Sequence, residues 1–366
     1  MKPIVFLCFI TLSMGLPAAH AQMLYGAKDD SGKFGFIDLA GNWVITPQYD
    51  QVEPFSERHA CFQNKATRLW GYINTQGQTV VPPKFSPAKD FANGLAQVKT
   101  GEMYGMIDTT GAWVIKPDYE HVEIFTNGIG RARKHSAKWG YLNKKEEWVI
   151  PPVFDGLEDF SEGLARAKQD GGWGYIDVQG NWVVKPVYEH AGDFSEGLAG
   201  VRSSEGWFVI NKRGERIGEN TFDDVTRFQQ GVARVRKRDR WGLIDSRGNW
   251  ICDAKFYYLE KFVDGLARAA IDHQWGYVDN TGKWVIEPKF EAARDFTEGL
   301  AQVMLFNNKW GYIGRNGDWV IQPTFNDTGS FINGYAVVRK GDYGIINKTG
   351  TFVVPAKFKK ILRLKY

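Results

Sequence analysis

The 366-residue sequence is poor in cysteine and almost balanced in charge. It has three cysteines, of which Cys8 lies in the apolar N-terminal run and only Cys61 and Cys252 lie beyond it. These two form no Cys-x-x-Cys motif, and a chain of this length can bury a core without a disulfide framework, so we expect free or buried thiols. The net charge of +4 gives no indication that the protein binds nucleic acid.

Long apolar runs are also missing, apart from one at the N-terminus. Residues 1–21 begin with one basic residue, continue apolar to Leu16 and end in Ala19-His20-Ala21, a pattern typical of a cleavable signal peptide. The run is too short and too interrupted by polar residues to span a bilayer, and no later stretch approaches about 18 consecutive apolar residues. We therefore predict cleavage near Ala21, export to the periplasm or the extracellular space, and no transmembrane segment.

No motif for catalysis or cofactor binding interrupts the rest of the chain. The glycines punctuate turns instead of forming a phosphate-binding loop, and the acidic residues recur at fixed turn positions, which favours a structural role over a tuned acid–base pair. The histidines after residue 21 share no metal-ligand spacing and are His59, His121, His135, His190 and His273. We predict that the protein is not an enzyme and holds neither a metal ion nor a cofactor.

What the sequence has in abundance is aromatic residues, at 14%, with 14 tryptophans that recur at regular intervals. Ten units follow one another, and they open on aromatic residues at positions 34, 70, 104, 139, 173, 207, 241, 275, 310 and 343. In most units a glycine comes next, as in the pairs Trp70 and Gly71, Trp139 and Gly140, Trp173 and Gly174, Trp241 and Gly242, Trp275 and Gly276, and Trp310 and Gly311. Such periodicity indicates a single repeat array over residues 22–366, with the recurring aromatic residues in its core.

The offsets inside a unit indicate short β-strands separated by turns. Counted from the opening aromatic residue, glycine stands at +7 in nine units, tryptophan at +9 in seven, and Tyr or Phe at +15 in all ten. In the unit that opens at Trp173, residues 173–177 and 181–186 read as two strands around a tight turn, and a third strand follows at 198–201. The pattern predicts an all-β fold of tandem three-stranded β-meanders that stack on one another.

The two chain ends leave the overall shape open. The last unit stops after Phe358 without its third strand, while residues 23–27 resemble a third strand that precedes the first unit. In a closed propeller this N-terminal strand would complete the final blade, whereas in an open solenoid both ends would be caps. Because ten units exceed the usual propeller blade number and three strands are fewer than usual, we predict an open, curved β-solenoid, with a closed propeller-like ring as the alternative.

The unit from Trp173 to Val201 reads W-G-Y-I-D-x-x-G-x-W-V-V-x-P and ends in F-S-E-G-L-A-x-V. It resembles the repeat of the WG-repeat family, and the resemblance covers the whole chain after residue 21. It implies a binding or interaction scaffold, and the units are also similar in kind to cell-wall-binding repeats, which hold envelope polymers. The departures are local: Phe208 replaces the glycine, Arg216 and Thr79 replace the second tryptophan, and the proline is missing in two adjacent units, before Phe222 and Phe256.

Basic residues gather near the connections between units. If the units stack in register, they would form a basic stripe across repeats three to six, in which the candidate ligand-binding residues are Arg131, Arg133, Lys134, Arg234, Arg236, Lys237 and Arg238. Such a stripe would bind an anionic envelope polysaccharide, a lipid head group or an acidic protein face. The alternative is that these side chains are solvated strand ends that discourage edge-to-edge pairing.

Taken with the absent motifs, this pattern favours a secreted, non-enzymatic repeat scaffold that binds a protein or an envelope polymer through several units. A cell-envelope enzyme and a purely structural spacer are the two alternatives that the sequence leaves open.

Overall fold

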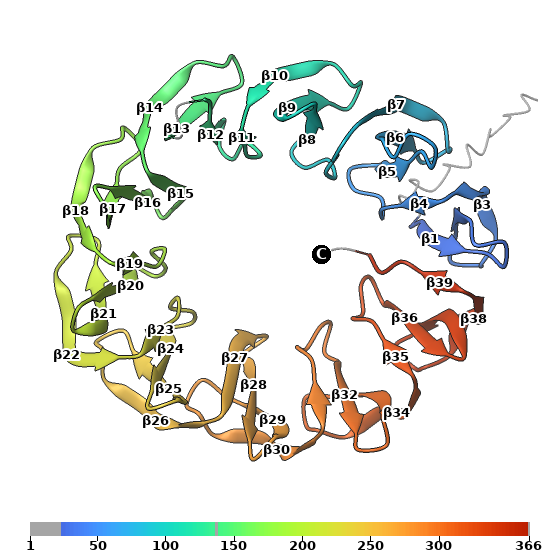
Figure 1. The fold of residues 1–366 in the computed structure, drawn as a ribbon. Coiled ribbons are helices and arrows are strands. Elements are labelled where there is room, and N and C mark those ends of the chain that lie inside the picture. Colours follow the sequence, from blue (N-terminus) through green and yellow to red (C-terminus); the bar gives the residue numbers. More distant parts are fainter. Residues whose placement is uncertain (1–22, 136–137, 365–366) are drawn as a thin grey trace, which may run out of the picture.

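The computed structural model describes residues 23–135 and 138–364, so the predicted signal peptide at residues 1–21 lies outside the described residues. Within this part of the chain, 39 strands form ten sheets that follow one another around a closed ring with a wide central opening (Figure 1). The fold is a ten-bladed β-propeller. The expectation of an all-β chain is confirmed, whereas the expectation of an open solenoid is wrong and the closed ring is the correct alternative.

We number the blades from 1 to 10 and give their strands from the inner to the outer edge. Blades 1 to 5 comprise β39 (Lys360–Ile361), β1 (Tyr25–Lys28), β2 (Phe34–Ile37) and β3 (Trp43–Tyr49); β4 (Gln51–Val52), β5 (His59–Gln63), β6 (Trp70–Asn74) and β7 (Thr79–Phe85); β8 (Leu95–Thr100), β9 (Met103–Asp108) and β10 (Trp113–Tyr119); β11 (His121–Val122), β12 (Ile129–Arg133), β13 (Trp139–Asn143) and β14 (Trp148–Phe154); and β15 (Gly156–Ser161), β16 (Leu164–Gln169), β17 (Gly172–Ile176) and β18 (Trp182–Tyr188). Blades 6 to 10 comprise β19 (His190–Ala191), β20 (Leu198–Ser203), β21 (Gly206–Asn211) and β22 (Arg216–Phe222); β23 (Asp224–Val225), β24 (Val232–Lys237), β25 (Arg240–Asp245) and β26 (Trp250–Phe256); β27 (Tyr258–Val263), β28 (Leu266–Ile271), β29 (Gln274–Val278) and β30 (Trp284–Phe290); β31 (Ala292–Ala293), β32 (Ala301–Leu305), β33 (Lys309–Ile313) and β34 (Trp319–Phe325); and β35 (Asp327–Thr328), β36 (Tyr335–Lys340), β37 (Asp342–Asn347) and β38 (Phe352–Phe358).

The prediction of three-stranded units is also wrong, because a short inner strand adds a fourth strand to most blades. In blade 3 a single bridge between Ala88 and Val98 stands in its place. Each sequence unit contributes the two outer strands of one blade and the two inner strands of the next, as β17 and β18 are followed by β19 and β20. The turn that follows β20 is therefore a hairpin turn inside one blade, between β20 and β21, and the units interlock around the ring.

The ring closes by strand pairing between the two ends of the chain. Strand β1 pairs with β2 on one side and with β39 on the other, with Ala27 opposite Ile361 and Lys28 opposite Lys360. The backbone N–H of Leu362 also donates to the carbonyl of Gly26 at 2.7 Å. The N-terminal strand thus supplies the strand that the last unit lacks and completes blade 1, which removes the two free ends that a solenoid would have to cap.

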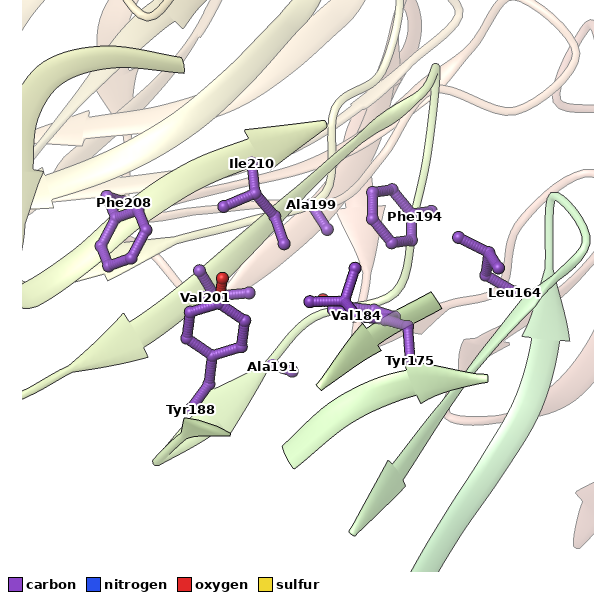
Figure 2. Close-up of a cluster of buried hydrophobic side chains, with 10 residues drawn as sticks. All are labelled: Leu164, Tyr175, Val184, Tyr188, Ala191, Phe194, Ala199, Val201, Phe208 and Ile210. Atoms are coloured by element: carbon purple, nitrogen blue, oxygen red, sulfur yellow. The ribbon is translucent and has the colours of Figure 1, made fainter. Parts of the chain in front are cut away.

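The hydrophobic core lies between blades. Ten buried clusters each join two neighbouring sheets, and Figure 2 shows the one between blades 5 and 6. In it, Tyr175 and Val184 of blade 5 meet Phe194, Val201 and other residues of blade 6. The cluster at the ring closure has the same form, because Ile361 and Tyr25 pack with residues of blade 10. Burial of apolar side chains thus holds blades 10 and 1 together in the same way as every other pair of neighbouring blades.

The glycine of the Trp-Gly pair has a steric cause. Trp173 pairs with Tyr188 and Tyr175 pairs with Val184, so three residues of the outer strand bulge across Gly174. A Cβ atom on Gly174 would lie 2.4 Å from the carbonyl oxygen of Val184. The tyrosine that follows links two blades, because the hydroxyl of Tyr175 donates to the carbonyl of Gly192 in blade 6 at 2.7 Å.

Candidate functional site

The blades place their turns on two faces of the ring. On one face lie the hairpin turns between the second and third strands and the connections from each outer strand to the next blade; on it, the backbone N–H of Arg238 donates to Asp223 Oδ2 at 2.7 Å. We call this the connection face. The opposite face has the Phe-x-x-Gly turns and the Asp-x-x-Gly turns, and there Lys212 Nζ donates to the carbonyl of Glu162 at 2.9 Å. We call it the glycine-turn face.

Recurring carboxylates on the glycine-turn face bond backbone N–H groups. Asp177 Oδ1 accepts from the N–H groups of Gln179 and Asn181 at 3.0 and 2.8 Å, which closes the hairpin turn of blade 5. Glu162 of the same blade accepts from the N–H groups of Glu196 and Gly197 in blade 6, at 2.7 and 2.9 Å. Glu57, Glu196 and Glu298 make the equivalent bond to their following blades. These acidic residues join turns and blades, which matches the structural role expected from their repetition.

Two of the predicted ligand-binding residues lie in the contacts between blades. Arg131 Nη1 donates to the carbonyl of Leu157 in the next blade at 2.6 Å, and its Nε lies 2.8 Å from Asp159. Arg234 Nη1 donates to the carbonyl of Leu259 at 2.6 Å. Burial lowers the pKa of Arg234, although nearby carboxylates oppose the shift. Both arginines tie one blade to the inner strand of the next.

The other five predicted residues surround the hairpin turns on the connection face. Arg133 Nε lies 3.2 Å from Glu120, and Lys134 forms an ion pair with Asp118. In blade 7, Arg236 lies opposite Trp241 in the strand register. Lys237 Nζ donates to the carbonyl of Thr221 at 2.6 Å, while the side chain of Arg238 is exposed. The seven residues therefore form no continuous stripe with one role, and anion binding by the whole set stays a prediction.

Acidic residues accompany the basic ones around the connection face. The residue before an opening aromatic residue faces the residue at +16, which begins the connection to the next blade. Lys33 and Asp50 form such an ion pair at 2.8 Å, and Lys138 and Asp155 form the same pair in blade 4. In blade 10 the charges are exchanged, since Asp342 faces Lys359 at 3.5 Å. In these three blades the pair neutralises the basic residue at the connection.

Blade 7 has a basic residue at −1, Arg240, but no acidic residue at +16, as is also the case for Lys309 and Asn326 of blade 9. In blade 7 the residue at +16 is Tyr257, and the guanidinium of Arg240 lies over its ring, 5.0 Å from the centroid. The ring of Tyr257 is 40% exposed and meets the rings of Tyr258 and His273 at 4.9 and 5.3 Å. Tyr258, 46% exposed, stacks on Trp275 at 5.5 Å with an interplanar angle of 10°. A carboxylate that neutralises positive charge elsewhere is thus replaced by an exposed aromatic group.

A hollow of about 540 Å³ adjoins these rings between the outer parts of blades 6 and 7. Three basic residues, Lys237, Arg238 and Arg240, and two acidic residues, Glu219 and Asp253, line it. Asn220 and Ala254, which stand where most units have proline, line it as well. We call the hollow with the neighbouring rings the basic–aromatic patch; its exposed basic and aromatic members are Arg238, Arg240, Tyr257, Tyr258 and His273, and the exposed Glu219, Asn220 and Asp253 lie at the hollow beside them. Sequence reasoning included Lys237 and Arg238 but missed Tyr257 and Tyr258. The sequence does show that this unit has Tyr257 in place of an acidic residue at +16. That replacement becomes informative only when the structure shows that Arg240, at −1, lies against it.

Over residues 23–135 and 138–364, no three His, Cys, Asp or Glu side chains come together as metal ligands. Within the same ranges, no helix is long and apolar enough to cross a membrane. Cys61 in blade 2 and Cys252 in blade 7 are both free thiols.

Comparison with known proteins agrees with the repeat and with the ring. The model of the WG containing repeat matches ten consecutive segments, at residues 34–64, 70–104, 104–136, 139–173, 173–207, 207–241, 241–272, 275–310, 310–342 and 343–365. The chain belongs to the WG-repeat family. No curated protein matches it.

A solved structure described as the eukaryotic initiation factor is similar with a TM-score of 0.51 at 11% identity, over 84% of this chain and 98% of that chain. BamB from Moraxella catarrhalis is similar with a TM-score of 0.39 at 14% identity, over 71% of this chain and 89% of that chain. The likeness to the first of these structures concerns the fold alone.

Proposed function

We propose that this WG-repeat propeller is a non-enzymatic binding scaffold whose partner is a protein with an acidic surface segment, bound at the basic–aromatic patch. The observation that supports the proposal is the exchange of the usual acidic residue for Tyr257 beside Arg240. It gathers exposed tyrosines and arginines at one place on the connection face. Tyr, Trp and Arg dominate the residues that contribute most to protein–protein affinity, and the arginines supply complementarity to an acidic segment.

Export is part of the same proposal, and it rests on the sequence of residues 1–21. The absence of an enzymatic role is proposed because the recurring carboxylates are engaged with backbone N–H groups, as in Glu162 and Asp177. An anionic envelope polysaccharide is the second candidate ligand. The exposed ring of Tyr258, which stacks on Trp275, offers a flat apolar surface on which a sugar could lie.

The test compares binding of a labelled acidic peptide, rich in glutamate and containing one tyrosine, with binding of polygalacturonate. A double variant, Arg238→Ser with Arg240→Ser, removes two positive charges from the patch. Its matched control, Arg213→Ser with Arg247→Ser, removes the same charge from exposed positions on the glycine-turn face of blades 6 and 7. We expect peptide binding that weakens as salt rises, falls at least tenfold in the patch variant and stays unchanged in the control.

Equal binding by the two double variants would refute the proposed site. Loss of polygalacturonate binding in the patch variant, without any peptide binding, would favour the polysaccharide as ligand. If the protein binds neither probe, the structural-spacer alternative is favoured. A third variant, Tyr257→Ser, separates the contribution of the aromatic ring from that of the positive charges. Loss of the ring should weaken binding without changing its salt dependence.

A further inference from the structure

A second cavity lies where the ring closes. It has a volume of about 200 Å³ and is lined by Tyr25, Arg294, Ser330, Ile332, Tyr335, Val337, Arg363 and Leu364. These residues come from blade 1, from the segment between β31 and β32, from blade 10 and its flanking segment, and from the chain that follows β39. The cavity therefore lies at the junction held by the two-residue pairing of β1 with β39.

One wall of the cavity is positively charged. Arg363 Nη2 lies 2.6 Å from Asp327 Oδ2, and Arg294 Nη2 lies 3.9 Å from Asp327 Oδ1, so two guanidinium groups share one carboxylate. Burial lowers the pKa of Arg294, and repulsion from Arg363 lowers it further. A second anion beside Asp327 would relieve this repulsion, and guanidinium groups are well suited to bind a carboxylate.

Two residues that line the cavity, Tyr25 and Ser330, carry hydroxyl groups with donor capacity. Tyr25 is 2% exposed, and among the described residues its hydroxyl has no hydrogen-bond partner. Burial, and then the nearby Tyr335, raise the pKa of Tyr25 to about 12, so the hydroxyl keeps its proton at neutral pH. Ser330 Oγ lies 3.2 Å from Gln302 Nε2 and accepts from it, which leaves the hydroxyl hydrogen of Ser330 to donate elsewhere. A buried hydroxyl without a partner costs free energy that a ligand oxygen could recover.

The remaining walls are apolar. Ile332, Val337 and Leu364 contribute aliphatic side chains to the lining. The volume of about 200 Å³ suits a small molecule. A ligand that fits must therefore combine one anionic group with a short apolar part.

We propose that this cavity binds a small aliphatic carboxylate, with its carboxylate at Arg294, Arg363 and the hydroxyl of Tyr25, and its chain on the aliphatic wall. The site is separate from the basic–aromatic patch and does not depend on it. A bound carboxylate joins blades 9, 10 and 1 with the chain that follows β39, so it fastens the closure of the ring.

Titration calorimetry of the purified protein with sodium hexanoate, at constant ionic strength, tests the proposal directly. Butyrate, 1-hexanol and inorganic phosphate are titrated in parallel. We expect one hexanoate site, butyrate binding about tenfold weaker because it lacks two methylene groups, and no saturable binding of 1-hexanol, which lacks the charge. The melting temperature should rise with hexanoate concentration. Phosphate that binds more tightly than hexanoate would overturn the assignment to a carboxylate with an apolar chain.

Two variants and a control locate the site. Tyr25→Phe should weaken hexanoate about tenfold while leaving the free energy of unfolding unchanged or higher, because it removes a buried hydroxyl that has no partner. Arg363→Lys should weaken it too, since the ammonium group cannot reproduce the guanidinium geometry. Tyr104→Phe is the control, because Tyr104 is half-buried in blade 3, away from the closure. Unchanged hexanoate affinity in Tyr25→Phe and Arg363→Lys would overturn the proposal, and so would a loss of stability in Tyr25→Phe.

Discussion

The ring of Phe208 in blade 6 lies edge-on against the ring of Tyr188 in blade 5, with centroids 6.0 Å apart and planes at 70° (Figure 2). In other units the second tryptophan makes this contact, as Trp182 does against Phe154 at 5.8 Å and 80°. Phe208 therefore takes over the inter-blade contact of a tryptophan that its own unit lacks.

The two departures of the sixth unit, Phe208 in place of the glycine and Arg216 in place of the second tryptophan, compensate each other. In blade 7, a Cβ atom on Gly242 would lie 2.7 Å from the ring of Trp250, so the glycine makes room for the second tryptophan as well as for the outer strand. Where Arg216 replaces that tryptophan, the space above the glycine position is free for Phe208. The guanidinium of Arg216 then lies over the new ring, 4.7 Å from its centroid.

We expect Phe208→Gly to lower the free energy of unfolding by about 3–5 kcal/mol, because it leaves a cavity between blades 5 and 6. The double variant Phe208→Gly with Arg216→Trp should recover most of this loss, since it restores the common pattern. Urea denaturation of the wild type, both single variants and the double variant gives the coupling energy. Additive effects of the two substitutions would contradict the compensation described above.

Gly174→Ala should destabilise the protein by about 1–3 kcal/mol, because the added Cβ would press on the carbonyl oxygen of Val184 and force the outer strand away. Gly314→Ala is a matched control, since the nearest atom to its added Cβ is the flexible side-chain oxygen of Asn316 at 3.3 Å. Chemical denaturation measures the free energy of unfolding of both variants. Equal losses in the two variants would show that glycine flexibility, and not the close approach of the outer strand, explains the Trp-Gly pair.

Acid should weaken the contact made by Glu162. Burial raises the pKa of this carboxyl, but hydrogen bonds from Gly197, Lys212 and Glu196 outweigh burial and hold the pKa below its ordinary value. The stabilisation is therefore complete above the pKa of the unfolded chain and is lost as the pH falls through the lower pKa of the folded state. Glu162→Gln should reduce stability at pH 7 and flatten the fall in stability between about pH 5 and pH 3.

The control for this experiment is Glu205→Gln, whose side chain is 69% exposed and pairs with Arg216 at 3.3 Å. Exposed pairs of this kind contribute about 0–1 kcal/mol, so its stability at pH 7 should stay close to that of the wild type. Denaturation curves recorded across the pH range give both profiles. If the two variants follow the same profile, the bond from Glu162 to the next blade contributes little to stability.

Ring closure can be trapped covalently. Ala27 and Ile361 are register partners in β1 and β39, so cysteines at the two positions lie within disulfide range. In a background with Cys61→Ala and Cys252→Ala, the pair Ala27→Cys with Ile361→Cys should oxidise within one chain and raise the melting temperature. Non-reducing electrophoresis and mass spectrometry detect the link. An open array would keep these ends apart and yield only links between chains.

Much of the local structure could be predicted from the order of residues. The offsets of aromatic residues and glycines place the strands and turns of the unit at Trp173, and β17 and β18 occupy residues 172–176 and 182–188. The short inner strands were missed because two residues such as His190–Ala191 have no period of their own and pair only with β20 of the same blade. Tyr257 was missed for a similar reason, since its partner Arg240 lies beside it only through the pairing of β25 with β26.

The sequence by itself determined the repeat, the all-β character, the buried aromatic residues and the turn role of the acidic residues, because these follow from local conformational preferences and from a rigid period. Only the tertiary structure decided that each unit is divided between two blades and that the ends meet. Both depend on the angle at which one sheet packs on the next, a property of the inter-blade contacts around Tyr188 and Phe208 and not of any single unit. Because those angles add up to a full turn after ten blades, β1 meets β39 and the array closes into a ring.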